Sequence, residues 1–581
     1  MPDRLLRPVS VAPRGATGHR AATRRRGRRV LGAFLGALLV GSTVGSTTAP
    51  TDAPAAARRY PMRVLSGWVP YWKRTTGPAG VAAMASLASS TSSFAYAATS
   101  ATGIARLSSL DANGAIRSAA AAARIPLVPT VTDSTGTGKM AIILADSTQR
   151  AAHVERLVRL AVDGRFDGID LDYESFAYRD GSSTWATTKP LWTQFVAELG
   201  AALHARAKLL FVTVPPTYNN SETRGSGYWV YNLVGIAPHV DRIRIMAYDW
   251  AYSRVGPNAP LSWTQKIVDY AAANLPVSKV ELGVPLYGRD WVTGVSGTCP
   301  AGATTTGRVS IITSSALALA KKHGKTPTRG THGEMVFSYT VPYYASTPTP
   351  SSTTTTTTDV VITDPVSTDP SIDDGSTTVP VTSEPPPTLL CSVTRTVYYP
   401  DAVSSQRKLE QALAKGLAGV VFFAVGYEES THFRGLRSLA LTVPKATGAN
   451  PIGRWRITPG DPGTVRVRGW ALDPETSLPI RIRVVVNGRT KAVALANTEN
   501  TAVGAAYPGN GPFHGADVTV PLARGRYRVC VDGIGVGSGL SVRRLGCAYV
   551  RVTAPATTTS TSATSSSTTS SSTTAPAAPT A

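Results

Sequence analysis

The chain alternates short apolar runs with helix-like stretches from residue 62 to residue 443. Apolar residues recur every three or four positions, as on one face of a helix, over residues 151–162, 191–207, 262–274 and 404–415. Eight short apolar runs lie between or beside these stretches and predict buried strands. They are residues 64–69, 93–97, 127–131, 167–172, 209–214, 242–247, 279–284 and 419–425. Eight strand-and-helix units predict an α/β fold, a (β/α)8 TIM barrel with insertions, over residues 58–443.

The pattern changes in residues 450–553, where Gly and Pro punctuate short alternating strands. These strands are predicted at residues 464–467, 480–486, 517–520, 527–531 and 548–552. We expect a small β-sandwich as an accessory domain. Trp455 and Trp470 could form a carbohydrate platform, although such Trp residues more often belong to the core. Residues 451–552 hold 14 Arg and Lys against 6 Asp and Glu, a net charge of 14 − 6 = +8.

Two Ser/Thr/Pro-rich tracts are predicted not to fold. One covers residues 345–387, including six threonines in a row at 353–358, and the other covers residues 554–581. Such composition buries too little apolar surface to offset the entropy lost on ordering. The first tract is a long insertion before the last strand of the predicted barrel, and the second is a tail. Both could carry O-linked glycans.

Residues 1–57 have the pattern of a signal peptide. Five arginines between Arg24 and Arg29 precede an apolar run at residues 30–40, and small residues lead to Ala55-Ala56-Ala57. The apolar run is shorter than the ~20 residues of a membrane span. We predict cleavage after Ala57 and a secreted, extracellular protein, with an uncleaved anchor and cell-wall association as open alternatives.

The four cysteines fit an oxidising compartment. They are Cys299, Cys391, Cys530 and Cys547, and four cysteines allow three connectivities. Proximity in sequence favours Cys530–Cys547, which leaves Cys299–Cys391. No cysteine spacing is typical of a metal site, so neither a metal nor a cofactor is expected.

The formal net charge is +23, of which the first 57 residues contribute +7, so the remainder carries 23 − 7 = +16. A basic secreted protein adheres to anionic surfaces, and cell-wall polymers are candidate partners. Nucleic acid is the alternative partner, but the basic residues after Arg29 are dispersed and we do not expect it. A monomer is expected.

The most informative stretch for chemistry is residues 166–174, Phe-Asp-Gly-Ile-Asp-Leu-Asp-Tyr-Glu. Side chains alternate between the two faces of a strand, so Asp170, Asp172 and Glu174 share one face. Crowding of like charges raises the pKa of at least one of them. A carboxylic acid that keeps its proton near neutral pH is what cleavage of a glycosidic bond requires. Asp167 has the opposite parity and is expected to be structural.

Two other interpretations of this stretch are weaker. A solvated strand edge is disfavoured because the alternate positions are apolar. The three carboxylates could hold Ca²⁺ or Mg²⁺, but the glycine and distant Glu of a calcium loop are absent.

Five motifs, in order, make residues 64–429 resemble glycoside hydrolase family 18, which contains chitinases and related N-acetylglucosamine-cleaving enzymes. Residues 167–174 match the family pattern DGxDxDxE, and residues 246–249, Met-Ala-Tyr-Asp, match MxYD. The first-strand motif is similar to residues 67–72, the seventh-strand motif to residues 283–291, and the closing helix and strand to residues 397–408 and 416–426. The family often carries an insertion domain before the last strand, and residues 332–339 resemble a remnant of it.

The resemblance implies a retaining mechanism assisted by the substrate. Glu174 would protonate the leaving oxygen, and the substrate's own N-acetyl group would attack the anomeric carbon. Asp172 would stabilise the resulting oxazolinium ion, Asp170 would share a proton or hydrogen bond with Asp172, and Tyr248 would hydrogen-bond the acetamido carbonyl. The resemblance also implies substrate contacts from Asp249, Phe423, Trp68, Tyr287 and Arg289.

Two departures from the family pattern bear on the substrate. Phe423 stands where the family usually has a Trp under the reacting sugar, and Tyr173 stands where chitinases often have Trp. Phe offers less area for stacking, so chitin and peptidoglycan are both candidate β-1,4-linked N-acetylglucosamine substrates, and the pattern is closer to the spore-cortex and peptidoglycan-associated branch. A catalytically weak or silent wall-binding lectin on the same fold is the alternative, although such proteins usually lack the acid that Glu174 supplies.

Overall fold

The computed structural model describes residues 60–107, 114–345 and 388–554. The predicted signal peptide, almost all of the tract at 345–387 and almost all of the tail therefore lie outside the described residues. Within the described ranges, no helix is both long and apolar enough to cross a bilayer.

Eight parallel strands form a closed barrel, as predicted. They run in the order β1-β14-β8-β7-β6-β5-β4-β2, and pairing between β1 and β2 closes the sheet. A short antiparallel strand, β3 (Ile104–Arg106), lies beside β2. The barrel strands are β1 (Leu65–Pro70), β2 (Ser92–Ala98), β4 (Thr130–Asp133), β5 (Gly168–Asp172), β6 (Leu209–Val214), β7 (Arg242–Ile245), β8 (Val280–Pro285) and β14 (Gly419–Phe423).

Helices cover the outside of the barrel because every strand turns one set of apolar side chains outward. One large buried cluster joins the strands to these helices. It includes Ile169 and Leu171 of β5 and Tyr173, which follows that strand. Gly168 is required by close approach, since a Cβ there would lie 2.2 Å from the Leu209 carbonyl oxygen. The larger helices are α1 (Gly77–Met84), α2 (Ala115–Ala123), α3 (Lys139–Ala145), α4 (Ser147–Asp163), α6 (Trp185–His204), α8 (Leu261–Asn274) and α10 (Ala402–Ala414); α5 (Ser175–Tyr178), α7 (Leu233–Ile236) and α11 (Leu436–Ala440) are short.

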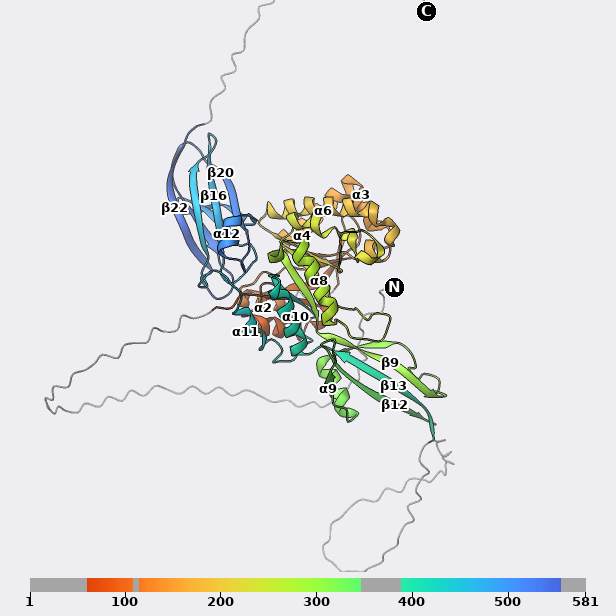
Figure 1. Ribbon diagram of the computed structural model, residues 1–581. Helices are drawn as coiled ribbons and strands as arrows, with labels where there is room; N and C mark the ends of the chain where they lie inside the picture. Colours follow the sequence, from red (N-terminus) through yellow and green to blue (C-terminus); the bar gives the residue numbers. More distant parts are fainter. Residues whose placement is uncertain (1–59, 108–113, 346–387, 555–581) are drawn as a thin grey trace, which may run out of the picture. The chain divides into compact units, whose positions relative to one another are not determined.

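The region before the last barrel strand is a five-stranded antiparallel sheet, so the expectation of a mere remnant at residues 332–339 is wrong. The order is β10-β9-β13-β12-β11, and Figure 1 shows β9, β12 and β13 as long neighbouring strands with α9 beside them. The sheet was missed because the long strands β12 and β13 alternate between more and less buried positions, so neither contains a long apolar run. Its elements are β9 (Tyr287–Gly297), β10 (Arg308–Ile312), α9 (Thr313–Lys322), β11 (Thr328–Arg329), β12 (Met335–Tyr344) and β13 (Leu389–Tyr399).

Residues 452–552 form two four-stranded antiparallel sheets around a second apolar core. The orders are β15-β16-β20-β19 and β18-β17-β21-β22. Trp455 packs against this core and Trp470 packs near Tyr507, which favours the core interpretation of both residues. The elements are β15 (Ile452–Pro459), β16 (Thr464–Leu472), β17 (Arg481–Val486), β18 (Arg489–Leu495), β19 (Thr498–Glu499), α12 (Thr501–Ala506), β20 (Phe513–Pro521), β21 (Gly525–Ile534) and β22 (Val542–Val552).

The cysteines pair as sequence proximity suggested. Cys299 bonds to Cys391 in the five-stranded sheet region, and Cys530 bonds to Cys547 between β21 and β22.

Candidate active site

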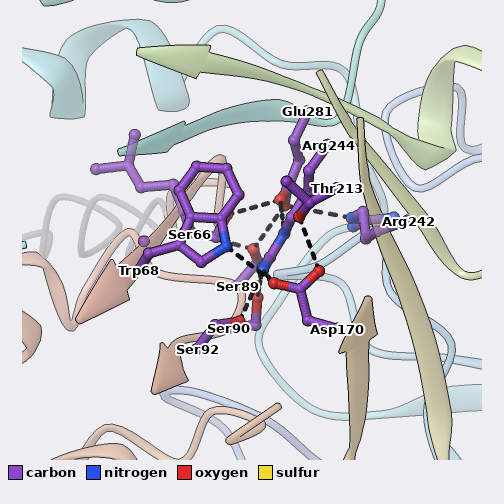
Figure 2. A network of polar contacts seen from close by, with 12 residues as sticks. Ser66, Trp68, Ser89, Ser90, Ser92, Asp170, Thr213, Arg242, Arg244 and Glu281 are labelled. Atoms are coloured by element: carbon purple, nitrogen blue, oxygen red, sulfur yellow. Dashed lines mark hydrogen bonds and ion pairs between the residues drawn. The ribbon is translucent and has the colours of Figure 1, made fainter. Parts of the chain in front are cut away.

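Asp170 of β5 lies fully buried inside the barrel, where side-chain donors surround its carboxylate (Figure 2). Trp68 Nε1 donates to Oδ2 over 2.9 Å, Thr130 Oγ1 donates to Oδ2 over 2.8 Å, and Thr213 Oγ1 donates to Oδ1 over 2.9 Å. Arg244 Nη1 lies 3.1 Å from Oδ2. Because all four partners donate, the surroundings of Asp170 match a carboxylate in a fixed orientation.

Arg244 connects Asp170 to a second buried acid, Glu281 of β8. Its Nε lies 3.0 Å from Glu281 Oε2, while Arg242 Nε lies 3.3 Å from Glu281 Oε1. Burial alone would raise the pKa of Glu281, but the charges of Arg244 and Arg242 lower it. Two arginines therefore balance two acids in the barrel interior. Serine hydroxyls complete the network in Figure 2: Ser66 and Ser89 donate to Glu281, and Ser90 and Ser92 accept from Arg244.

Asp172 and Glu174 follow at the carboxyl end of β5 and form a coupled pair. Asp172 is only 5% exposed, whereas Glu174 is partly exposed. Burial raises the pKa of Asp172 well above its ordinary value, and the charges of Glu174 and Asp170 and a hydrogen bond with Glu174 raise it further. Burial raises the pKa of Glu174 to about 7, against the lowering effect of its hydrogen bond with Asp172 and with the support of the Asp249 charge. The pair therefore holds a proton near neutral pH.

One oxygen of the pair lacks a hydrogen-bond partner among the described residues. Among the described residues, Asp172 Oδ1 is buried and has no hydrogen-bond partner. An unpaired buried acceptor costs free energy unless something completes it. A substrate N–H is one group that would do so.

Aromatic rings surround the open end beside this pair. Tyr248 stacks on Phe423 with ring centroids 5.7 Å apart and an interplanar angle of 27°. Trp68 and Tyr287 pack against the same Phe423 ring at 6.1 and 6.0 Å. Burial raises the pKa of Tyr248 well above its ordinary value, so its hydroxyl remains a hydrogen-bond donor.

Asp249 is held in an unusual conformation by Asn258 and, through Asn258, by the distant Glu334. Its φ is 61°, in the left-handed region that non-glycine residues seldom adopt. Asn258 Oδ1 accepts from the Asp249 N–H over 2.7 Å, and Glu334 in turn accepts the backbone N–H groups of Asn258 and Ala259. Such strain persists only where surrounding contacts fix it, as at functional sites.

Residues 115–428 match the family description "Glycosyl hydrolases family 18", which is more than half of the chain. The chain belongs to this family.

Curated relatives match shorter stretches. The putative sporulation-specific glycosylase YdhD of Bacillus subtilis is 30% identical over 171 residues, which is 28% of this chain and 38% of the relative. A probable endochitinase of Caenorhabditis elegans is 31% identical over 179 residues, 27% of each chain, and a cortical fragment-lytic enzyme of Bacillus anthracis is 26% identical over 153 residues, 26% of this chain and 33% of the relative. The matches thus span well under half the length of these relatives.

The structure of this family 18 chain brings the predicted catalytic residues together. The predicted catalytic residues interact through hydrogen bonds or charge: they are Asp170, Asp172, Glu174 and Tyr248. Asp170 affects Asp172 through its charge alone, because its carboxylate accepts hydrogen bonds from other groups. Asp249 also belongs to the group, since its charge raises the pKa of Glu174.

Three of the remaining predicted substrate contacts are buried and bind the acids of the site rather than facing its opening. Trp68 is 1% exposed and donates to Asp170. Tyr287 and Arg289 are also buried and both donate to Asp249 Oδ1, over 2.9 and 2.5 Å. Phe423 is partly exposed. In this arrangement Trp68, Tyr287 and Arg289 orient acids, and their direct contact with substrate stays a prediction.

Two residues of the acidic stretch point away from the site, as their parity predicted. Asp167 accepts the backbone N–H of Leu127 over 3.0 Å. Tyr173 packs among the helices, and its hydroxyl lies 2.7 Å from His153 Nε2. The identity of Tyr173 therefore bears on packing rather than on the sugar.

Sequence reasoning missed Arg244, Glu281, Asn258 and Glu334. Arg242 and Arg244 gave a signal, because two arginines alternating with isoleucines in a buried strand both point into the barrel. Asn258 and Glu334 gave none, since each acts across loops. Among the described residues, no group of three His, Cys, Asp or Glu side chains is arranged to hold a metal ion.

Proposed function

We propose that this protein is a secreted retaining glycosidase that cleaves β-1,4-linked N-acetylglucosamine-containing glycan, chitin or peptidoglycan. The observation that carries the proposal is the proton-sharing Asp172–Glu174 pair at the end of β5, facing Tyr248. Active sites of TIM barrels lie at the carboxyl ends of the strands. Membership of family 18 supports the same reaction.

In the first half of the reaction, Glu174 gives its proton to the glycosidic oxygen as the bond to the anomeric carbon breaks. The substrate's acetamido oxygen attacks the same carbon and forms an oxazolinium ion. Asp172 Oδ1, the free buried acceptor, would take the acetamido N–H and stabilise the positive charge. The Tyr248 hydroxyl would donate to the acetamido oxygen and hold it in line for attack.

In the second half, Glu174 accepts a proton from water as the water oxygen attacks the anomeric carbon. The ring of the oxazolinium ion opens and restores the acetamido group. Two inversions at one carbon give net retention. Asp170, held by Arg244, lies next in the strand on the same face as Asp172.

The choice of glycan rests on Phe423 and on the relatives. Phe423 offers less stacking area than the Trp usual in the family, which weakens the case for crystalline chitin. Relatives include proteins named as sporulation-specific and cortical fragment-lytic enzymes as well as a probable endochitinase. We therefore favour glycan strands of the peptidoglycan type, with soluble chitin oligosaccharides as model substrates.

Secretion is part of the proposal. It is supported by the signal-like pattern of residues 1–57 and by two disulfides, which persist in oxidising compartments. N-terminal sequencing of protein from the culture medium tests it. A mature protein beginning at Arg58 is expected, and a protein retained in the cytoplasm with residues 1–57 attached would contradict it.

The catalytic proposal is tested with Glu174→Gln and a matched surface control, Glu155→Gln on α4. On N-acetylglucosamine oligosaccharides, Glu174→Gln should lose about 10²–10⁴-fold in kcat, the usual contribution of a general acid. Glu155→Gln should match the wild type. Binding of the oligosaccharide without turnover by the wild type would instead indicate a lectin.

The role of the substrate's acetamido group is tested by removing it. N-deacetylated oligosaccharides of the same length should bind but not be cleaved, since they lack the nucleophile. Equal rates on acetylated and deacetylated chains would contradict the assisted mechanism while leaving a glycosidase. Parallel digestion of purified peptidoglycan decides between the two glycans.

A further inference from the structure

The outer face of the β18-β17-β21-β22 sheet carries a row of arginines beside one exposed tyrosine. Strand alternation turns Arg526 and Arg528 of β21 outward while Val529 and Val531 enter the core. Arg526 lies directly opposite Arg551 of β22, and Arg528 lies opposite Tyr549. The two facing pairs therefore place three arginines on the same face of the sheet as Tyr549.

This face is hollowed next to the tyrosine. A hollow of about 670 Å³ is lined by residues that include Arg524, Arg526, Tyr549 and Arg551. Tyr549 is 70% exposed, and the Arg526 guanidinium carbon lies 5.7 Å from the centre of its ring. A large exposed aromatic side chain beside a hollow is a common feature of ligand sites.

The arginines of the hollow are uncompensated. Among the described residues, Arg524, Arg526 and Arg551 make no ion pair with a carboxylate. Elsewhere on the same sheet, Arg483 and Arg544 share Asp532. Positive charge is therefore left available beside Tyr549 and is neutralised further along the sheet.

We propose that this hollow binds an anionic glycan, a chain of sugar rings that bear phosphate or carboxylate groups. Guanidinium groups recognise both anions through paired hydrogen bonds, and the phenol ring offers a flat face to a sugar. A neutral glycan would leave the three charges unused. Single-stranded nucleic acid usually stacks successive bases on several aromatic rings, and this hollow offers one. The choice of a glycan rests on the proposed function, whereas the anionic character of the ligand does not.

The test is sedimentation of the full-length protein with purified bacterial wall sacculi at several salt concentrations. Intact sacculi carry phosphate polymers, and sacculi treated with hydrofluoric acid keep only carboxylates, so the two preparations distinguish the source of the anion. Arg526→Gln/Arg551→Gln should weaken binding to at least one preparation about tenfold. The slope of log affinity against log salt concentration should become shallower by about two, because two fewer counter-ions are released on binding. Tyr549→Ser should weaken binding without changing that slope.

The matched control is Arg454→Gln/Arg456→Gln, which removes the same number of positive charges from two exposed arginines of β15 on the other sheet. It should bind as the wild type does. Equal losses in the two double variants would reduce the effect to net charge and overturn the proposal. So would unchanged binding by Arg526→Gln/Arg551→Gln, or tighter binding of single-stranded DNA than of either sacculus preparation.

Hydrolysis of neutral N-acetylglucosamine oligosaccharides is measured on the same variants and should be unchanged. A protein that binds sacculi through the hollow but hydrolyses nothing would defeat the proposed function and leave this inference standing. Loss of hydrolysis in Arg526→Gln/Arg551→Gln would show that the change is not local, and would count against the site.

Discussion

At the scale of single residues, the site separates three acids that the sequence places on one strand face. Asp170 is fixed by four donors deep in the barrel, Asp172 keeps one free oxygen, and Glu174 is partly exposed at the opening. The three acids differ in their surroundings, and these surroundings set the protonation and hydrogen bonding available to each acid. We propose that Glu174 is the group that donates a proton to a substrate oxygen.

The first prediction concerns the pH dependence of hydrolysis. Because burial raises the pKa of Glu174 to about 7, kcat/KM should fall as pH rises above about 7, when the acid loses its proton. Asp249→Asn removes a charge that raises this pKa, so the falling limb should move to lower pH. A limb that stays in place in Asp249→Asn would contradict the coupling between the two acids.

The second prediction concerns stability. The folded protein holds the Glu174 proton up to about pH 7, whereas the unfolded chain releases it near its ordinary value of 4.5. The folded state binds more protons in that window, so this acid lowers the free energy of unfolding as pH rises, by at most about 1.4 kcal/mol per pH unit. Urea unfolding should therefore show Glu174→Gln gaining stability over the wild type from pH 5 to pH 7. A constant difference across that range would argue against the raised pKa.

At the scale of elements, the polar network in the barrel interior ties together strands from β1 to β8. Ser66, Ser92, Asp170, Arg244 and Glu281 come from five different barrel strands. Such a network fixes strand register only when all its members are satisfied. It also makes Arg244 the residue that positions Asp170.

The third prediction tests that role. Arg244→Met leaves Asp170 and Glu281 buried with an uncompensated charge and should cost about 3–5 kcal/mol in urea unfolding. Adding Asp170→Asn should cost much less than the two single changes together, since the pair acts as a unit. Arg159→Met removes an exposed ion pair on α4 and should change stability by no more than about 0.5 kcal/mol. Additive losses in the double variant would contradict direct coupling.

The strands that could be predicted from the sequence are mostly those that are buried on both faces. A strand such as β6 is buried on both faces, so its sequence is an almost continuous apolar run. β15 and β18 were missed because they alternate exposed and partly buried residues. In the site, Asp172 and Glu174 were found because strand parity is local, whereas Asn258 and Glu334 act through contacts 75 or 76 residues apart.

At the scale of the whole molecule, two disulfides of different span stabilise different parts. Cys299–Cys391 joins residues 92 apart, and Cys530–Cys547 joins residues 17 apart. Buried contacts also connect the barrel to the segment before β17, where Arg242 Nη2 donates to Ser477 Oγ over 2.7 Å. The chain is therefore best studied at full length.

The fourth prediction follows from the two spans. A cross-link stabilises mainly by restricting the unfolded chain, and the longer loop restricts it more. Cys299→Ala/Cys391→Ala should lower the free energy of unfolding by about 1–2 kcal/mol more than Cys530→Ala/Cys547→Ala does. Chemical unfolding followed by circular dichroism measures both. An equal or larger loss from the short span would show that strain or local packing governs instead.

The central claim is that Glu174 and the substrate's own acetamido group cleave the glycosidic bond with retention. Proton NMR of the anomeric signals during hydrolysis of an N-acetylglucosamine tetramer tests it most directly. The wild type should release the β-anomer first, with the α-anomer appearing later by mutarotation, and Glu174→Gln should release neither on the same timescale. Release of the α-anomer first, or equal product from Glu174→Gln, would contradict the account.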